Sequence, residues 1–393
     1  MNERRLFLDY LAQISDSPLM LEIEKAEGVF LFDVYGKRYF DLISGISVSN
    51  MGHRHPKVIK AISDQLEKYL YIMVYGEYVQ SPQVRFANLL AEQLPPTLNN
   101  TYLVNSGSEA VEGALKLAKR YTGRSEVVAF NNAYHGSSHG ALSVMGNEEF
   151  KNSFRPLVPG TRFLEFGNFD DLDQISKHTA CVIIEPIQGE AGIVLPGKNY
   201  LKAIRDKCTE TETLLILDEI QTGFGRTGSL FAFEQFDIVP DIICFAKGIG
   251  GGMPIGAFVS SREIMSVFKT NPVLGHLTTF GGHPVSCAAA FASLHALLEE
   301  GWVDQVPEKE DLFRKLLVHK KIKNLRGKGL FFAMDMNDSE QVQDLIKKLL
   351  EKGIIVDWFL FKDDSIRIAP PLIITMKEIE EACQIILEAL DQI

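Results

Sequence analysis

Lys247 is the side chain whose position in this sequence best suits nucleophilic chemistry. It follows an apolar run, residues 242–246, and precedes a glycine-rich loop, residues 248–252. Most lysines are solvated at the surface, but a lysine at the end of an apolar strand is partly desolvated, which lowers its pKa. The neutral amine is the form that attacks an aldehyde, so this position predicts a Schiff-base lysine.

Two acidic side chains, Asp218 and Glu219, follow another apolar run, residues 214–217, and Gln221 comes shortly after them. If the two runs are neighbouring parallel strands, these side chains reach the same sheet edge as Lys247. An acid at a strand end can bind a metal ion, cap a helix or pair with a cationic ring nitrogen.

The histidines do not support the first of these uses. His53 and His55 flank Arg54, and His135 and His139 form the other close pair, with no acidic residue at ligand spacing beside either pair. A zinc site needs three or four ligands that converge. We therefore predict no metal site and interpret these histidines as turn or packing residues.

The stretch 105–110, Asn-Ser-Gly-Ser-Glu-Ala, lies between a predicted strand and a predicted helix. Ser106 and Glu109 have the spacing of a capping box, which would make this stretch a well-capped helix start. Gly107 would also let backbone N–H groups approach an anion at the helix N-terminus, as in a phosphate-binding loop. The motif alone does not decide between these two interpretations.

Two glycine-rich stretches match nucleotide-binding fingerprints only in part. Residues 192–198 have the spacing G-x-x-x-x-G-K, but Asn199 stands where a serine or threonine must bind Mg²⁺, and Pro196 lies inside the loop. Residues 248–253 fail the G-x-G-x-x-G pattern at Met253. We therefore disfavour P-loop and dinucleotide-binding enzymes.

The remaining features together predict a site for pyridoxal 5'-phosphate (PLP). The aldehyde of this cofactor needs a lysine, its pyridinium nitrogen needs an acid, and its phosphate needs backbone donors. Lys247, Asp218 and the loop at Gly107 supply one of each, all after predicted strands. The prediction rests on this combination rather than on any one motif.

An alternation of strand and helix patterns would bring these residues together. Amphipathic stretches, such as the apolar positions on one face of residues 110–118, lie between short apolar runs. The alternation predicts an α/β fold with a mainly parallel sheet covered by helices. The runs are 101–104, 127–130, 181–184, 214–217, 242–245 and 255–259.

The pattern differs at both ends of the chain. Residues 1–45 hold a short apolar run at 29–32 and a turn at 35–37. A long buried helix is expected at 288–298, and beyond it the chain alternates between strand patterns at 331–336, 354–358 and 366–369 and two helices. We predict an N-terminal segment 1–45 that packs with the small domain, a large PLP-binding domain 46–300 and a small α+β domain 301–393.

The composition excludes several classes of protein. Of 393 residues, 46% are hydrophobic and 23% charged, which excludes a disordered or fibrous chain. The 40 basic and 51 acidic side chains give a net charge of −11, which argues against non-specific nucleic-acid binding. The 5 cysteines form no C-x-x-C, and no apolar stretch approaches the roughly 18 residues of a membrane span. We expect no membrane partner and a cytoplasmic location.

In this order the motifs closely resemble those of class III, fold-type-I PLP-dependent aminotransferases, the group of acetylornithine, ornithine and 4-aminobutyrate aminotransferases. The similarity runs from Gly36 to Pro371. The resemblance implies a large domain whose sheet is of the seven-stranded type, and a smaller α+β domain built from both ends of the chain. The most specific stretches are 105–110, 185–190, 217–223, 246–248 and 278–282.

The resemblance implies a role for each site residue. Lys247 would hold the cofactor as a Schiff base and later move the proton, and Asp218 would pair with the pyridinium nitrogen. Tyr134 would stack on the ring, His135 beside it would also belong to the cofactor-binding residues, and Gln221 would lie near the ring hydroxyl. The cofactor phosphate would be held by Ser106, Gly107 and Ser108, joined by Thr279 of the neighbouring subunit.

A site shared in this way implies a homodimer. Arg367 resembles the arginine that binds the substrate α-carboxylate, and a guanidinium matches a carboxylate geometrically. Glu190 resembles the acid that pairs with this arginine while an ω-amine is bound and releases it for glutamate.

The chain departs from the family at Ser137. Many members that use ornithine-type substrates or 4-aminobutyrate have an arginine there, which binds the distal carboxylate. Unless Arg54, His139 or another group replaces it, acetylornithine and 4-aminobutyrate lose their usual anchor.

Together these features predict a PLP-dependent aminotransferase that moves an amino group, expected to be terminal, from an amino acid or an acetylornithine-like acyl-diamino acid to 2-oxoglutarate. The alternatives on the same fold are a glutamate-1-semialdehyde-type aminomutase and a decarboxylating PLP enzyme. A catalytically silent binding protein is a more distant alternative, and Lys247 and Asp218 argue against it. An aminomutase needs no external 2-oxo acid, so an obligatory requirement for 2-oxoglutarate would separate the two enzymes.

Overall fold

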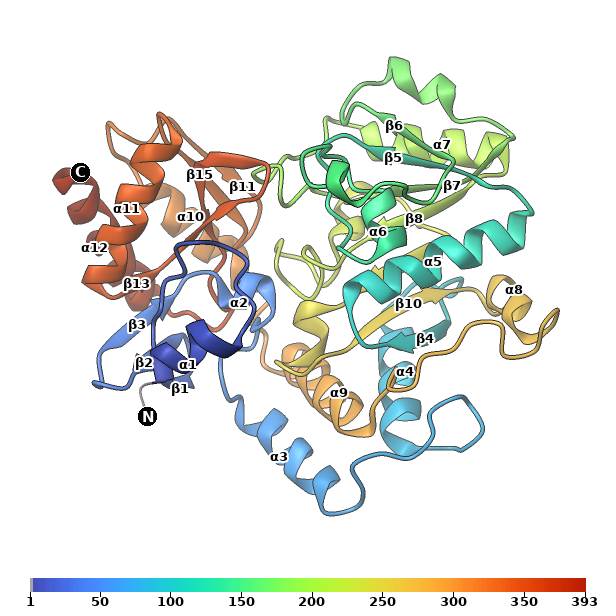
Figure 1. Ribbon diagram of the computed structural model, residues 1–393, viewed down its shortest axis with the longest axis horizontal. Coiled ribbons are helices and arrows are strands. Elements are labelled where there is room, and N and C mark those ends of the chain that lie inside the picture. The colour runs from blue at the N-terminus through green and yellow to red at the C-terminus, as the bar shows by residue number, and fades with distance from the viewer. Residues whose placement is uncertain (1–2) are drawn as a thin grey trace.

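A seven-stranded sheet forms the centre of the protein (Figure 1). The structure is a computed structural model that describes residues 3–393. In the order β4-β10-β9-β8-β7-β5-β6, only β10 runs against its neighbours, so the predicted α/β class and mainly parallel sheet are confirmed. The strands are β4 Asn100–Val104, β5 Glu126–Phe130, β6 Thr161–Leu164, β7 Thr179–Ile184, β8 Leu214–Asp218, β9 Ile242–Phe245 and β10 Gly256–Ser260.

Alternate residues of the central strands enter two separate cores, one on each face of the sheet. Val182 and Leu215 pack into one core, whereas Ile183 and Ile216 pack into the other. All residues of β7 are buried, as expected of a parallel strand covered on both faces. One face is covered by α5 Gly107–Thr122, and the other by α4 Ser81–Glu92, α7 Tyr200–Thr211 and α9 Pro284–Glu299.

Two four-stranded sheets lie beside this body, on the left of Figure 1. The first contains the N-terminal strands, and its β3 pairs in parallel with β13, so residues 38–41 and 354–355 join the two ends of the chain. The second is built from C-terminal strands alone. The domain bounds at residues 45 and 300 stay a prediction. The strands are β1 Ile23–Glu27, β2 Phe30–Asp33, β3 Arg38–Asp41 and β13 Ile354–Ile355, then β11 Asn324–Gly327, β12 Phe332–Asp335, β14 Asp357–Phe359 and β15 Lys362–Ile368.

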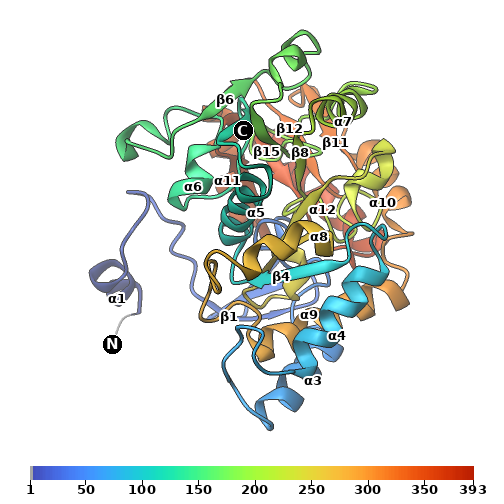
Figure 2. The same ribbon diagram turned by 90° about the vertical axis from the view of Figure 1, so that its right-hand side faces the viewer.

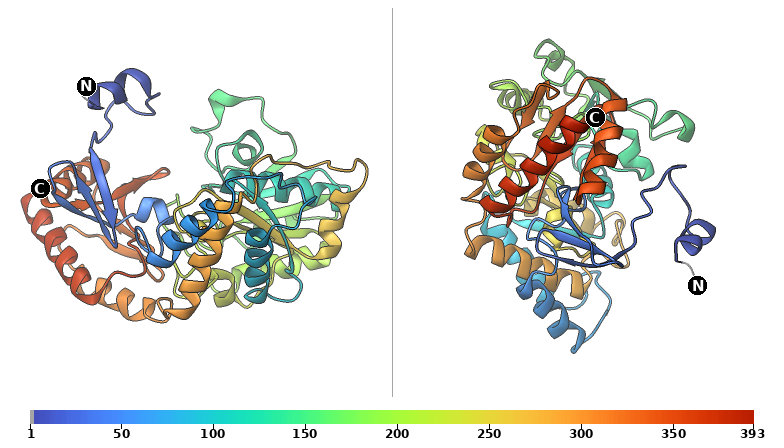
Figure 3. Two further views of the ribbon diagram at one scale, coloured as in Figure 1. Left: turned by 90° about the horizontal axis from the view of Figure 1, so that it is seen from below. Right: turned by 90° about the vertical axis from the view of Figure 1, so that its left-hand side faces the viewer.

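The expected long buried helix is α9, which contacts α3 and α4. Helix α1 stands away from the rest of the chain (Figures 2 and 3). Among the helices of residues 3–393, none is both long enough and apolar enough to cross a membrane. The remaining helices are α1 Glu3–Tyr10, α2 Ser44–Ser47, α3 Pro56–Leu66, α6 His139–Ser143, α8 Arg262–Met265, α10 Val306–Leu316, α11 Ser339–Lys352 and α12 Met376–Gln392.

Two expectations about strands need correction. The run 354–358 is not one strand, because the chain leaves the sheet of β3 after Ile355 and enters the sheet of β15 at Asp357. Strand β6 was not expected at all. It lies at the edge of the large sheet, and three of its four residues are at least partly exposed, so its sequence lacks an apolar run.

Candidate active site

The strand ends of the large sheet surround a cavity of about 420 Å³. Its wall comes from the loops that follow β4 and β5 and from the ends of β7, β8 and β9. Strand β10 runs the opposite way, so residues 252–255 before it lie at the same edge. Open α/β sheets bind ligands outside the carboxyl ends of their strands, and this volume suits a cofactor.

Lys247 lines this cavity from a strained turn after β9. Its φ of +49° is a left-handed conformation, which a residue with a side chain adopts at a cost on the order of 1 kcal/mol or more. A Cβ on the next residue, Gly248, would come within 2.6 Å of the side-chain nitrogen of Asn50. Burial lowers the pKa of Lys247 to about 8, with Glu190 opposing the shift. The amine is therefore much closer to neutrality than a surface lysine.

Asp218 is paired with His135 in the wall of the cavity. Asp218 Oδ2 lies 2.7 Å from His135 Nδ1, and both side chains are buried. The other carboxylate oxygen accepts the backbone N–H of Ile220 at 3.0 Å. His135 Nε2 is buried and has no hydrogen-bond partner within the described chain. A buried unpaired nitrogen is costly, and a ligand in the cavity can remove that cost.

Glu185 had no predicted role, although it begins the family-specific stretch 185–190. Its two oxygens accept the backbone N–H groups of Tyr134 and Gly189, each at 3.1 Å. Burial raises the pKa of Glu185 to about 7, against the lowering effect of His135. The carboxyl group therefore joins the loop of Tyr134 to the loop of Glu190. The position of Glu185 at the start of the stretch 185–190 could have indicated this role from the sequence.

Glu219 follows Asp218 in the sequence but does not line the cavity. Its carboxylate accepts the backbone N–H groups of Ala232 and Phe233, at 2.9 and 2.7 Å, and the hydroxyl of Thr222 at 2.8 Å. Glu219 therefore stabilises a neighbouring turn, and only Asp218 of the two acids belongs to the site.

The start of helix α5 faces the cavity. Ser106 Oγ accepts the N–H of Glu109 at 3.2 Å, but the Glu109 carboxylate accepts the N–H of Asn105, so only half of the predicted capping box forms. A Cβ on Gly136 would lie 2.1 Å from the oxygen of Ser108, so only glycine allows the two loops to approach. The first N–H groups of a helix have no partner inside it and favour an anion.

Glu190 and Arg367 form a buried ion pair beside the lysine. Arg367 Nη2 donates to Glu190 Oε2 at 2.6 Å, and Gln221 donates to the other oxygen at 3.1 Å. Burial would raise the pKa of Glu190, but Arg367 and Lys247 outweigh it, and the pKa is lowered. Arg367 Nε and Nη1 are buried without a partner in the described residues. The pair therefore leaves two guanidinium nitrogens without a hydrogen-bond acceptor, while neither Arg367 nor Glu190 lines the cavity itself.

The groups considered as replacements for the absent arginine are bound or distant. Ser137 is exposed, and its hydroxyl lies 3.2 Å from the Tyr134 hydroxyl. His139 Nε2 lies 2.9 Å from the carbonyl of Pro156. Arg54 is exposed and does not line the cavity. Of the described residues that line the cavity, Lys247 is the one lysine or arginine.

The described residues fit PLP. The cavity wall contains the lysine, the carboxylate of Asp218, the ring of Tyr134 and the helix start at Gly107, as predicted from the sequence. The unpaired His135 nitrogen can also form a hydrogen bond to a ligand in the cavity, and glycine at position 136 lets the loop of Tyr134 approach Ser108 in the cavity wall. Thr279 is exposed and does not line the cavity of its own chain.

Known proteins resemble the chain over nearly its whole length. The family described as "Aminotransferase class-III" matches residues 11–390. Acetylornithine aminotransferase from Methanopyrus kandleri is 39% identical over 93% of the chain and 92% of its own length. The enzyme of the same name from Caldanaerobacter subterraneus is 37% identical over 96% and 95%. The ornithine aminotransferase structure from Toxoplasma gondii, with partial occupancy of PLP at its active site, superposes with a TM-score of 0.92 at 30% identity, covering 99% and 93% of the two chains.

Proposed function

The chain belongs to the class-III aminotransferase family and is a PLP-dependent enzyme that transfers an amino group between an amino donor and a 2-oxo acid, and we propose that this amino group is a terminal one. The Glu190–Arg367 ion pair carries this proposal. An ω-amine brings no α-carboxylate to the reacting carbon, so the arginine needs an internal counter-ion while that substrate is bound. The relatives favour transamination over the aminomutase, decarboxylating and silent alternatives.

The residues around Lys247 suit proton transfer. When bound, PLP supplies an aldehyde that takes up the amino group and a ring that withdraws electrons. We propose that the neutral amine of Lys247 would remove the proton from the amine-bearing carbon of the donor and return it to the former aldehyde carbon of the cofactor, since its lowered pKa suits a general base. Asp218, held by His135, would keep a negative charge at the ring nitrogen. Tyr134 would cover the ring face, and the α5 start would bind the phosphate.

Arg367 and Glu190 would exchange partners between the two half-reactions. During the first, Glu190 holds the guanidinium at 2.6 Å. During the second, the α-carboxylate of the 2-oxo acid, for which 2-oxoglutarate is the predicted compound, would displace Glu190. A bidentate guanidinium–carboxylate contact would then orient the oxo group toward Lys247.

The amino donor is expected to need no carboxylate distant from its reacting amine. Acetylornithine, the substrate named for the curated relatives, has a carboxylate distant from the reacting amine, and Ser137 offers it no positive charge. We propose that diamines and other ω-amines without that carboxylate react at least as fast as donors that have it. N-acylated diamino acids remain substrates if another group binds the carboxylate.

A panel of donors tests this function. The holoenzyme is mixed with ω-amino acids, diamines and N-acylated diamino acids, and the loss of the visible absorbance of the lysine-bound cofactor is followed. We expect loss with ω-amines and its return on adding 2-oxoglutarate. Turnover without any 2-oxo acid would instead indicate an aminomutase, and release of CO₂ a decarboxylating enzyme.

We propose that the enzyme is a homodimer in which Thr279 reaches the partner's phosphate site. Thr279 and Phe280 are exposed, and so are the apolar side chains just before them in the chain, Val273 at 71%, Leu274 and Leu277. Apolar surface of this extent is typical of an interface. Light scattering should give a dimer mass, and Thr279→Ala should weaken PLP binding; a monomer with full activity would contradict the shared site.

We also propose a cytoplasmic location. The cysteines, at positions 181, 208, 244, 287 and 383, are all buried and free, as expected in a reducing compartment. Cell fractionation tests this placement, and recovery in a membrane or extracellular fraction would contradict it.

A further inference from the structure

Arg226 is a fully buried arginine in the loop between β8 and β9, outside the wall of the cavity. No carboxylate of residues 3–393 forms an ion pair with it. Burial lowers the pKa of Arg226 to about 9, with Asp41 opposing the shift. A buried charge without a counter-ion is expensive, and apolar residues of similar volume are often more stable in its place. The hydrogen bonds of its guanidinium show which parts of the chain this buried charge joins.

The guanidinium of Arg226 donates to neutral oxygens on three segments. Nη1 donates to the carbonyl of Leu330 at 2.9 Å and to that of Pro370 at 2.5 Å. Nη2 donates to Asn50 Oδ1 at 2.6 Å and to Ser44 Oγ at 3.2 Å. The backbone carbonyl of Arg226 also accepts the N–H of Leu330, at 3.0 Å.

One of these segments is the end of the strand that carries Arg367. Ser44 donates its hydroxyl to the carbonyl of Ala369 at 2.6 Å, and Arg226 binds the next carbonyl, that of Pro370. Strand β15 ends at Ile368. Arg226 therefore fixes the chain two and three residues beyond the predicted carboxylate-binding arginine.

The second segment contains α2, whose four residues form a strained left-handed turn beside the cavity rather than a regular α-helix. Ser44, Gly45, Ile46 and Ser47 have φ values of +43°, +60°, +62° and +62°, and Val48, which follows, lines the cavity. A left-handed conformation is unfavourable for a β-branched residue such as isoleucine and persists only where surrounding contacts impose it.

A further contact within this second segment, that of Asn50, leads to the Lys247 turn. Asn50, which accepts from Arg226, donates through Nδ2 to the carbonyl of Phe224 at 2.9 Å. The same side-chain nitrogen would lie 2.6 Å from a Cβ at Gly248, directly after Lys247. Arg226 is therefore linked, through Pro370, Ser44 and Asn50, to the three parts that must be aligned for the second half-reaction. These parts are the strand end after Arg367, the turn 44–48 and the turn of Lys247.

We propose that Arg226 is a positioning residue that fixes Arg367 and the turn 44–48 relative to Lys247, so that the 2-oxo acid is held with its oxo group at the lysine. The inference rests on the proposed function, in which Arg367 binds the α-carboxylate. Neutral acceptors suit this task, because a carboxylate at the same place would compete with Glu190 and the substrate for the arginines.

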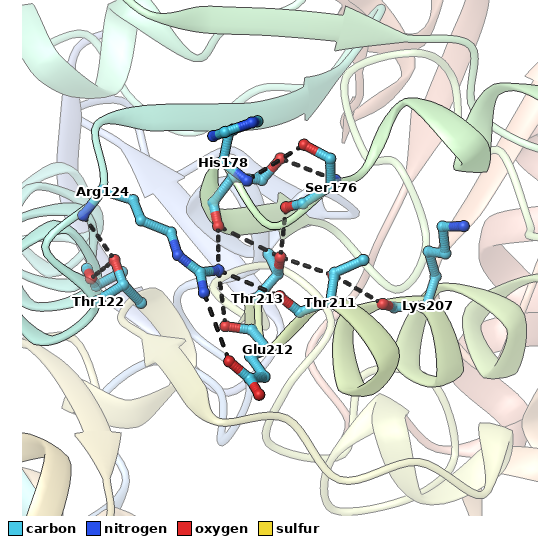
Figure 4. Close-up of polar contacts among 10 residues, drawn as sticks. Thr122, Arg124, Ser176, His178, Lys207, Thr211, Glu212 and Thr213 are labelled. Atoms are coloured by element: carbon cyan, nitrogen blue, oxygen red, sulfur yellow. Dashed lines mark hydrogen bonds and ion pairs between the residues drawn. The ribbon is translucent and has the colours of Figure 1, made fainter.

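Arg124 provides a matched control at the opposite end of the sheet (Figure 4). Its Nη1 donates to the carbonyls of Thr179, Thr211 and Glu212 at 3.1, 3.2 and 3.0 Å. Like Arg226, it joins several segments through backbone carbonyls, but its Nη2 also lies 3.8 Å from Glu212 Oε2, and it lies at the amino ends of β5, β7 and β8. Its substitution should cost stability without altering substrate binding.

The experiment compares Arg226→Lys and Arg226→Met with Arg124→Lys and Arg124→Met in the holoenzyme. A lysine has one donor nitrogen and cannot span four acceptors as the planar guanidinium does. We expect Arg226→Lys to raise KM for 2-oxoglutarate about tenfold while kcat for the first half-reaction changes less than about threefold. Calorimetric binding of 2-oxoglutarate should weaken by a similar factor. The visible absorbance of the bound cofactor should not change.

The Arg124 variants should lower the urea midpoint and leave KM, binding and absorbance unchanged. If Arg226→Lys shows that same pattern, Arg226 is a structural residue and the proposal is wrong. If Arg226→Met does not fold, Arg226→Lys alone decides. A wild-type enzyme that binds 2-oxoglutarate but transaminates no donor would refute the proposed function, while the loss of binding in Arg226→Lys would still support the positioning role.

Discussion

The two ends of strands β5, β7 and β8 in the seven-stranded sheet differ in how completely the buried polar atoms beside them are paired. At the carboxyl edge, His135 Nε2 and Gln221 Oε1 are buried without a hydrogen-bond partner in the described chain. At the amino edge, Thr213 Oγ1 contacts two carbonyls and the hydroxyl of Thr211, and Arg124 donates to three carbonyls (Figure 4). The same strands β5, β7 and β8 end at both edges.

This difference distinguishes the amino edge, whose buried polar atoms bind one another, from the carboxyl edge, whose polar atoms can bind a ligand. Buried polar atoms are nearly always paired in native proteins, so two unpaired atoms in one cavity wall suit a site that binds a ligand. The shifted pKa values of Lys247 and Glu185 fall at the same edge. Shifted pKa values in a cavity are typical of functional sites. The unpaired polar atoms and the shifted pKa values therefore indicate the same edge of the sheet.

Removal of Lys247 should have the largest effect. Lys247→Ala takes away the base and the aldehyde-binding amine together, so turnover should fall by a factor on the order of 10³ or more. The rate of the first half-reaction is followed by absorbance with an ω-amine donor. At the amino edge, Lys207 binds Asp173 at 3.1 Å, and Lys207→Ala should retain the wild-type rate within about twofold. Equal losses in both variants would remove the distinction between the edges.

Two aspartates on neighbouring strands sharpen the comparison. Asp218→Asn removes the negative charge that His135 holds at the ring nitrogen, and kcat should fall by about 10² or more. Asp241 accepts from Arg205 and from the N–H of Leu215, at 2.8 and 2.7 Å, at the amino edge. Asp241→Asn should cost about 1 kcal/mol of unfolding free energy and leave kcat unchanged. Steady-state kinetics and urea unfolding of both variants measure the two quantities.

The carboxyl edge was predictable because local patterns mark it. Lys247 and Asp218 each follow an apolar strand, and glycines such as Gly107 and Gly136 stand where loops must approach closely. A strand end and a glycine that follows it can both be recognised from a few consecutive residues of the sequence. Strands β4, β5, β7, β8, β9 and β10 and helix α9 were therefore located within a few residues from the sequence.

Contacts between distant segments were not predictable. Arg226 binds atoms of Ser44, Asn50, Leu330 and Pro370, and no spacing in the sequence connects these positions. A fully buried arginine with neutral acceptors also contradicts the ordinary preference of arginine for the surface. The division of 354–358 between two sheets has the same cause, because its partners β3 and β15 lie far away in sequence.

The pH dependence of PLP uptake tests the electrostatic half of the comparison. Only the neutral amine of Lys247 reacts with the aldehyde, so the uptake rate of the cofactor-free protein should rise with pH, reach half its maximum near pH 8 and level off above about pH 9. For a group of this pKa the neutral fraction increases about tenfold from pH 7 to pH 9. Stopped-flow absorbance measures the rate at each pH.

Glu190 gives this prediction its internal control. The carboxylate raises the pKa of Lys247 against the larger effect of burial, so Glu190→Gln should lower that pKa and move the rise in rate to lower pH. A rate that still increases steeply near pH 10 in the wild type would show an ordinary lysine. A shift to higher pH in Glu190→Gln would contradict the sign of the interaction.

The smallest effect is expected from Thr213→Val at the amino edge. Thr213 is 2% exposed, and its hydroxyl lies 3.3 Å from the carbonyls of Ser176 and Thr179 and 2.8 Å from Thr211 Oγ1. Valine keeps the shape and removes the hydroxyl. Since Arg124 still donates to the Thr179 carbonyl and Thr211 still donates to Lys207, few groups lose their last partner. The loss of unfolding free energy in urea should be about 1 kcal/mol.

The kinetic constants of Thr213→Val should equal those of the wild type, because no contact of Thr213 reaches the cavity. A KM for 2-oxoglutarate that changes by more than about threefold would mean that the amino edge alters the site through strands β7 and β8. The two edges would then act as one cooperative unit, and pairing of polar atoms would no longer distinguish scaffold from site. Unchanged kinetics beside a measurable loss of stability would instead assign the amino edge to the scaffold alone.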